Sequence, residues 1–225
     1  QSIINNAFFS NLNSPQYSEL SISGAVTFYK SPVRINSAQF TDNNSEDALN
    51  LFKSDFYISN TTFFKTKSDA LDLDFSNGNL ENSNFEQIGN DAVDISGSKV
   101  TLNSLNIKNA GDKAISIGEK SNIFANNITI SKAEIGIASK DFSSIVLSNL
   151  NAEDTEVCLA AFQKKPEYGP GFIEVKNYVN QYTCNSYLLE SGSSIIVNKK
   201  QYEPNTRKVK NLLYGNEYGK STSKN

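Results

Sequence analysis

The feature that most constrains the fold of this chain is a repeat of 22 residues, which starts at Asp47. Successive lines of 22 residues begin DALNLF, DALDLD, DAVDIS, KAISIG, IGIASK and VCLAAF. Their second residue forms a gapless column of small side chains, namely Ala48, Ala70, Ala92, Ala114, Gly136 and Cys158. A period of this size indicates a solenoid, whose units bury their apolar faces only by stacking on one another.

Local alternation shows that the repeat is built from strands rather than helices. Leu71, Leu73 and Phe75 alternate with Asp72 and Asp74, and alternation at a period of two is typical of a strand. A rung of about 22 residues has room for three short strands and three turns. We therefore predict an all-β, right-handed parallel β-helix of about eight or nine rungs over residues 1–202. For residues 203–225 we expect a polar tail, in which VKNLLYG covers the open end of the core and GKSTSKN is a linker.

A second column, of Asn and Ser, lies three residues before a column of Phe and Ile. The Asn positions are Asn6, Asn60, Asn82, Asn127 and Asn149, and Ser37 and Ser104 fill the same place in other rungs. Asn tolerates the left-handed conformation, and its amide both donates and accepts hydrogen bonds. We expect these amides to stack at an inward turn. This pattern resembles the asparagine ladder of pectate-lyase-type β-helices, and the resemblance covers about residues 1–202. It implies a fold, not an activity.

Several phrases resemble a narrower group of bacterial proteins. The phrases are SEDALNL, SDALDLDFSNG, GNDAVDISGSKV, GDKAISIGEKS, ASKD and FQKKPEYGP. They are similar to the β-helix regions that accompany CotH-type kinase proteins in bacterial surface systems. That group offers no catalytic motif to transfer onto this chain. The resemblance therefore implies a secreted or cell-surface location and implies no chemistry.

The composition of the chain argues against several classes of binding partner. The net charge of −3 gives no basic footprint for nucleic acid, and no apolar run is long enough to span a membrane. The chain has no Met and no signal peptide, so we expect a piece of a longer chain or assembly. It also lacks His and Trp, and its only Arg residues are Arg34 and Arg207. The chain therefore lacks histidine, the usual acid–base side chain near neutral pH, and tryptophan, the side chain best suited to stack on sugars.

The outward positions of the repeat carry the first candidate site, a group of carboxylates. Asp72 and Asp74 point away from the core, and Asp94 stacks beside Asp72 one rung later. Neighbouring carboxylates repel unless a proton or cation lies between them, so these three residues are candidate Ca²⁺ ligands. Lys140 shares the column of Asp74. Asp72, Asp94 and Lys140 are therefore the catalytic candidates if the protein resembles calcium-dependent lyases. The alternative is a solvated acidic face, and it stays open.

A related column, Asp47, Asp69, Asp91 and Lys113, has the parity of the inward residues but lies at the turn before the strand. We expect these carboxylates to accept hydrogen bonds from free backbone N–H groups, and Lys113 to end the stack with the opposite charge. That role is structural.

Two insertions break the period, at residues 13–21 and at Lys164–Pro170. Insertions in a solenoid become loops on its flank, where binding residues often lie. The second loop places Lys164, Lys165, Glu167 and Tyr168 near Lys140, and these four are candidates for binding a glycan or a protein. A solvated loop is the alternative.

The two cysteines, Cys158 and Cys184, lie 26 residues apart, which is one rung plus the insertion. Neighbouring rungs bring Cα atoms within disulfide reach, but the two columns differ by about two positions. Both the disulfide and two free thiols stay open. A disulfide would indicate an oxidising compartment.

Two functions remain open from the sequence. The first is a non-catalytic surface module that binds a glycan or a protein, and the second is a calcium-dependent polysaccharide lyase, epimerase or hydrolase acting on an acidic glycan. The absence of a convincing base and of a substrate-gripping set favours the first.

Overall fold

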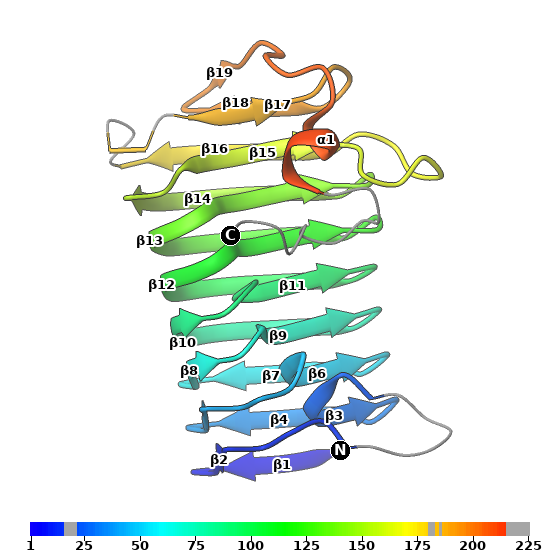
Figure 1. Cartoon of the computed structure of the whole chain (residues 1–225), viewed down its shortest axis with the longest axis vertical. Helices are drawn as coiled ribbons and strands as arrows, with labels where there is room; N and C mark the ends of the chain where they lie inside the picture. Colours follow the sequence, from blue (N-terminus) through cyan, green and yellow to red (C-terminus); the bar gives the residue numbers. More distant parts are fainter. Residues whose placement is uncertain (16–21, 180–182, 185, 215–225) are drawn as a thin grey trace.

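The structure, a computed structural model, describes residues 1–15, 22–179, 183–184 and 186–214. It is a parallel β-solenoid of about eight turns with a spacing of about 22 residues, as predicted. Figure 1 shows the rungs stacked along one axis, with β1 and β2 at the N-terminal end and β18 and β19 at the C-terminal end. No helix among the described residues has both the length and the apolar character needed to cross a bilayer.

Three parallel sheets run along the solenoid, and consecutive strands of each sheet lie one rung apart. The first sheet contains β1 (Ser2–Asn5), β4 (Val33–Asn36), β7 (Phe56–Ser59), the beginnings of β10 (Asn77–Ile88), β12 (Lys99–Gly118), β13 (Asn122–Lys140) and β14 (Ser144–Glu153), then β16 (Phe172–Tyr178) and β18 (Ser194–Val197). The second contains β2 (Phe8–Ser10), β5 (Gln39–Thr41), β8 (Thr62–Thr66) and later parts of β10, β12, β13 and β14.

The third sheet carries the site described below. It contains β3 (Gly24–Tyr29), β6 (Asp47–Phe52), β9 (Asp69–Asp74), β11 (Val93–Ser96), the ends of β12 and β13, then β15 (Val157–Phe162) and β17 (Tyr187–Leu189). Two short elements follow: β19 (Lys200–Gln201), which pairs antiparallel with β18, and α1 (Val209–Leu213).

Each rung turns at three corners, and each corner is a column of residues in the left-handed conformation, with φ between 47° and 64°. The first corner is formed by Asn6, Ser37, Asn60, Asn82, Ser104 and Asn127, the second by Asn11, Asp42, Lys65, Gln87, Asn109, Lys132 and Asp154, and the third by Lys30, Lys53, Phe75, Gly97, Lys120 and Phe142. A single left-handed residue redirects an extended chain sharply, so three of them per rung close the turn.

The predicted Asn/Ser column is the first corner, but its side chains point outward rather than inward. From Ser37 onward, the turn at each left-handed residue sends its own side chain towards solvent and buries the next residue, namely Ala38, Thr61, Ser83, Leu105 and Ile128. Some amides still stack as expected. Asn149 donates to Asn127 at 3.0 Å, and Asn177 donates to Asn149 at 2.9 Å.

The polar ladder inside the solenoid consists of serines that the sequence analysis missed. The buried hydroxyls of Ser76, Ser98, Ser121 and Ser143 each accept the backbone N–H of the preceding serine in the column, at 2.8–3.0 Å. These bonds satisfy N–H groups at the third corner that the sheets leave unpaired.

The core contains aliphatic columns and one aromatic column. Phe9, Phe40, Phe63 and Phe85 stack along the axis with ring centroids 4.7, 4.9 and 4.8 Å apart. This spacing is close to the distance between neighbouring strands, so rings in the same register stack face to face.

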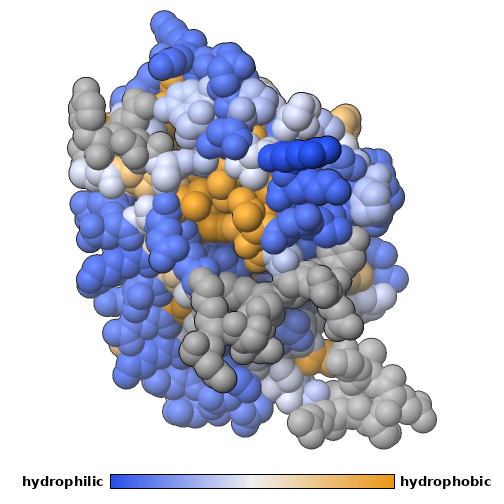
Figure 2. All heavy atoms as spheres, turned by 45° about the horizontal axis from the view of Figure 1, so that its top comes forward, coloured by the Kyte–Doolittle hydropathy of each residue, from blue (hydrophilic) through white to orange (hydrophobic). Residues whose placement is uncertain are grey.

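The C-terminal tail does not simply cover the end of the core. Helix α1 packs on the outer side of the third sheet, where Val209 belongs to an apolar cluster with Ala138, Ala160 and Phe162. Figure 2, which brings the C-terminal end forward, shows a mostly hydrophilic surface around one compact apolar area. The predicted linker GKSTSKN lies outside the described residues, as do residues 16–21 of the first predicted loop.

Candidate functional site

The outer side of the third sheet changes character along the axis, from acidic through basic to apolar. Paired in register, one column runs Asn50, Asp72, Asp94, Ser116, Ala138 and Ala160, and the next runs Phe52, Asp74, Ser96, Gly118, Lys140 and Phe162. This register places Asp94 beside Asp72 and Lys140 in the column of Asp74, as predicted. Helix α1 covers the apolar end of both columns.

The predicted calcium ligands form a partly buried acidic group. Asn50 donates its amide N–H to Asp72 at 2.7 Å and lies 3.5 Å from Asp74. Burial raises the pKa of Asp72 well above its usual value, and the charges of Asp47 and Asp74 raise it further. Among the described residues, no group of three or more His, Cys, Asp or Glu side chains has the arrangement to hold a metal ion. Calcium binding at Asp72, Asp74 and Asp94 stays a prediction.

The column of Asp47, Asp69, Asp91 and Lys113 faces outward, which corrects the inward parity assigned from the sequence. Each rung buries two consecutive residues, such as Ala70 and Leu71, and this pair shifts the alternation by one position. The predicted hydrogen bonds are present: Asp69 accepts the backbone N–H of Asp91, and Asp91 accepts that of Lys113, both at 2.9 Å.

Lys113 ends this column between two carboxylates. Its ammonium lies 3.5 Å from Asp91 and 2.5 Å from Asp112. Burial raises the pKa of Asp91 to about 6 and that of Asp69 to about 8, with a further contribution from neighbouring carboxylates. The carboxyl of Asp47 is raised to about 7, mainly by burial.

These raised pKa values predict a protein that is more stable in mild acid than in mild base. In the unfolded chain an Asp titrates near about 3.9, so Asp47 and Asp69 retain in the folded state a proton that the unfolded chain has already lost. Their stabilising contribution is complete below that pH and disappears as the pH rises through about 7 and 8. We expect a higher Tm at mildly acidic than at mildly alkaline pH.

Thermal unfolding followed by circular dichroism across this range tests the prediction. Asp69→Asn keeps an oxygen to accept the Asp91 N–H and should flatten the dependence, whereas Asp55→Asn, at an exposed position, should leave it unchanged. A wild-type Tm that rises steadily with pH over this range would contradict the raised values.

Beside the acidic group, Lys140 and Asp94 meet across two rungs. The Lys140 ammonium donates to the Ser116 hydroxyl at 2.7 Å and lies 4.0 Å from Asp94. Lys140 extends over Gly118, where a Cβ atom would lie in van der Waals contact, 3.4 Å from the Lys140 ammonium and its neighbouring carbon. Two of the three candidate catalytic residues are therefore in contact.

The insertion at Lys164–Pro170 supplies the next wall of the site. Asp141 is fully buried and accepts the backbone N–H groups of Lys164 and Lys165 at 2.8 and 2.7 Å, which anchors the loop. The Lys165 ammonium then pairs with Glu119. Lys164 lies over the ring of Tyr214, 4.2 Å from its centroid.

These residues enclose a cavity of about 250 Å³. Its lining includes the pair Asp94–Lys140, the triad Asp91–Asp112–Lys113, the pair Glu119–Lys165, and Asp141, Lys164 and Tyr214. Three buried oxygens on this lining have no hydrogen-bond partner among the described residues: Asp94 Oδ1, Asp141 Oδ2 and the Tyr214 hydroxyl. Such groups are rare in native proteins, where an ordered water, an ion or a ligand usually pairs with them.

Lys164 is a cation of the cavity whose pKa lies below its ordinary value. Burial, reinforced by the charges of Lys140 and Lys113, lowers the pKa of Lys164 to about 8. The same surroundings raise the pKa of Tyr214, because burial disfavours its phenolate. Perturbed groups in a concave site are typical of functional sites.

The sequence predicted part of this cavity. Asp94, Lys140, Lys164 and Lys165 line it, but Glu167 is exposed on the loop and Tyr168 contacts Lys120 instead. The cavity lining also includes Glu119, Lys113 and Tyr214, which the sequence did not suggest as ligand contacts. Tyr214 comes from outside the repeat, so no column position could have located it.

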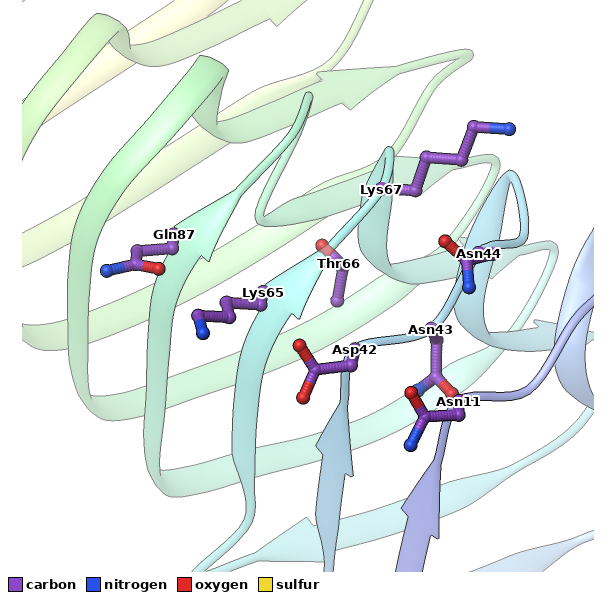
Figure 3. Close-up of a pocket in the computed structure, with 8 residues that line it drawn as sticks. All are labelled: Asn11, Asp42, Asn43, Asn44, Lys65, Thr66, Lys67 and Gln87. Atoms are coloured by element: carbon purple, nitrogen blue, oxygen red, sulfur yellow. The ribbon is translucent and has the colours of Figure 1, made fainter.

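A larger depression lies at the second corner, but it has no comparable feature. About 530 Å³ in volume, it is lined by polar residues that include Asn11, Asp42, Lys65 and Gln87, side by side on consecutive rungs in Figure 3. Its buried members are satisfied: Asn43 accepts the N–H of Leu12 and donates to the Phe9 carbonyl, and Thr66 donates to the Ser68 carbonyl. We therefore place the candidate site at the smaller cavity.

The cysteines are joined. Cys158 and Cys184 form a disulfide with their Cα atoms 5.7 Å apart, which links β15 to the segment after β16. The link spans the rung that carries the insertion.

Comparison of the chain with protein families, curated proteins and solved structures gave no match. The solenoid fold is shown by the structure itself.

Proposed function

We propose that this protein is an extracellular β-helix module that binds an acidic glycan, and that the cavity at Asp94, Lys140 and Lys164 receives one acidic sugar. The observation that carries the proposal is a cavity lined by four ammonium groups and five carboxylates, in which three lining residues have a buried oxygen without a hydrogen-bond partner among the described residues. Oxygens that lack hydrogen-bond partners and lysine ammonium groups therefore occur together around one small cavity.

The unpartnered oxygens favour a ligand with hydroxyl groups. Leaving a buried polar group unpaired costs about 1–3 kcal/mol, so a ligand that pairs with it recovers that free energy. A sugar hydroxyl donates one hydrogen bond and accepts others. Different hydroxyl groups of one sugar ring can donate to Asp94 and to Asp141, and another can pair with the Tyr214 hydroxyl. The volume of about 250 Å³ suits a single sugar unit better than a larger ligand.

The ammonium groups favour a sugar that carries a carboxylate. Lys113 is held by Asp91 and Asp112, and Lys165 by Glu119. Lys164 has no ion pair among the described residues, so its charge is available to a ligand anion, with Lys140 beside it. A hydrogen bond to a charged group contributes about 1.5–3 kcal/mol.

Titration calorimetry with uronic-acid oligosaccharides and matched neutral oligosaccharides tests this function. We expect the acidic ligands alone to bind, and Lys164→Met to weaken binding at least about tenfold. Binding should also weaken as the pH rises through about 8, where Lys164 loses its proton. Lys108→Met is the matched control, because Lys108 is half-exposed on the second sheet and pairs with Glu86. Equal binding of neutral and acidic ligands, or equal losses in both variants, would refute the proposal.

A polysaccharide lyase or epimerase is the second candidate, and the contact between Asp94 and Lys140 favours it. An acid–base pair beside a bound uronate could move the proton next to the carboxylate. The same oligosaccharides, incubated with and without Ca²⁺, would develop the absorbance of unsaturated products if a lyase were present. Turnover that is lost in Asp94→Asn would favour the enzyme. Binding without turnover would favour the module.

The location is part of the proposal. The disulfide between Cys158 and Cys184 supports an oxidising compartment, since cytosolic thiols are normally reduced. The phrases similar to β-helix regions of CotH-type bacterial surface systems support secretion or display at a cell surface.

A further inference from the structure

A second cavity, of about 260 Å³, adjoins the cavity of the candidate site. Its walls are the loop after β15, the residue that follows β17 and the first residues of α1. Figure 1 shows α1 beside that loop. Lys164 lines both spaces, so they lie side by side with this residue between them. We call the space at Asp94 and Lys140 the binding cavity and the second space the adjacent cavity.

Hydrogen bonds fix two walls of the adjacent cavity. On the loop, the side-chain amide of Gln163 donates to the carbonyls of Lys165 and Pro166, both at 3.3 Å. On the opposite side, the backbone N–H of Glu190 donates to the Ala161 carbonyl at 3.0 Å. The inserted loop and the segment after β17 are therefore both tied into the solenoid.

The charges of the adjacent cavity favour an anion. Its lining carries three ammonium groups, those of Lys164, Lys208 and Lys210, and one carboxylate, that of Glu190. The binding cavity, in contrast, has four ammonium groups and five carboxylates. Lys208 has no ion pair among the described residues, so its charge is available to a ligand. A concave surface lined mainly by one sign of charge concentrates ligands of the opposite sign.

The carboxylate of the adjacent cavity favours a ligand that also has hydroxyl groups. Glu190 has a buried Oε2 without a hydrogen-bond partner among the described residues. A sugar hydroxyl can donate to such an oxygen. Ammonium groups together with an unpaired carboxylate oxygen are also what the binding cavity offers, and the two volumes are nearly equal, at about 260 and 250 Å³. The two cavities therefore suit the same kind of chemical unit.

We infer that the adjacent cavity receives a second acidic sugar of the same glycan, so that the ligand is an oligosaccharide with carboxylates on consecutive units. This inference rests on the proposed function, because the first sugar occupies the binding cavity. Lys164 then lies between the two units, and Lys208 pairs with the carboxylate of the second. Once the first unit is bound, the covalent link holds the second at a high effective concentration beside its own cavity.

Titration calorimetry of the full chain with three ligands tests the inference. The ligands are a uronic-acid monosaccharide, the disaccharide of two such units, and a disaccharide of one uronic acid and one neutral sugar. We expect the diuronate to bind at least about tenfold more tightly than the monosaccharide. The disaccharide with one neutral unit should bind less tightly than the diuronate, because it has no carboxylate for Lys208.

Lys208→Met separates the two cavities. Lys208 lines the adjacent cavity but not the binding cavity, and its side chain makes no capping hydrogen bond to α1. The variant should bring the affinity for the diuronate close to that for the monosaccharide and leave the monosaccharide affinity unchanged. Lys200→Met is the matched control, since Lys200 is exposed on β19 and lines neither cavity. It should change no affinity. Circular dichroism checks that both variants fold.

The possible results distinguish this inference from the proposed function. A monosaccharide that binds as tightly as the diuronate would overturn the inference and leave the binding cavity in place. So would a diuronate whose tighter binding survives Lys208→Met. If neither acidic ligand binds, the proposed function is wrong and the inference fails with it.

Discussion

Phe63→Ala is expected to lower the free energy of unfolding by about 3–5 kcal/mol. Phe63 has no exposed surface and lies between Phe40 and Phe85, with ring centroids 4.9 and 4.8 Å away. Its removal leaves a cavity inside the aromatic column, and the stacked backbone above and below cannot collapse to fill it. Both neighbouring rings lose a stacking partner as well.

Equilibrium unfolding in urea measures this effect. Phe124→Ala is the control, because its 60% exposed side chain should change the stability by no more than about 0.5 kcal/mol. If Phe63→Ala proved as mild as Phe124→Ala, the stacked core would be wrong.

Removal of the disulfide is expected to lower the free energy of unfolding by about 3.5 kcal/mol, from the loop-closure entropy at the sequence separation of 26 between Cys158 and Cys184. The bond ties β15 to the segment after β16. Without it, the unfolded chain gains freedom while the folded rungs keep their strand pairing. Cys158→Ala/Cys184→Ala should show this loss in urea unfolding.

Reductant provides the control for the disulfide prediction. It should destabilise the wild type by a similar amount and leave the double alanine variant unchanged. A wild type that is insensitive to reductant, with two thiols detected by mass spectrometry after alkylation, would show that the bond does not form.

The rungs could be predicted from the sequence because their signals repeat at a fixed spacing. Alternation around Leu71 and Leu73 and the column of small residues define strands and period without reference to neighbours. The first corner was visible because Asn and Ser recur there. The second and third corners were not, because left-handed positions such as Lys65, Gln87 and Phe75 share no residue type.

Side-chain direction at the corners was the main error. The sequence placed the Asn column at an inward turn, by its resemblance to an asparagine ladder, and gave the Asp69 column inward parity by extending the alternation of the strands. A left-handed residue at the first corner, and two consecutive buried residues such as Ala70 and Leu71 at the start of the third sheet, each reset that alternation. Neither change in side-chain direction can be recognised from the alternation of apolar and polar residues in the sequence.

Only those residues of the candidate site that belong to the repeat could be predicted from the sequence. Register alone brings Lys140 within two rungs of Asp94. The position of Lys164 depends on how Asp141 anchors the inserted loop, and that of Tyr214 on the packing of α1 against the apolar end of the third sheet. Both are tertiary contacts between segments that lie outside the period.

The most direct test of the proposed function is a crystal structure of the protein with a uronic-acid monosaccharide. The sugar carboxylate should lie within hydrogen-bonding distance of the Lys164 ammonium, and its hydroxyl groups should pair with Asp94, Asp141 and Tyr214, whose oxygens otherwise lack partners. A cavity that stays free of sugar at saturating concentration, or a sugar bound on another sheet, would contradict the assignment of this site.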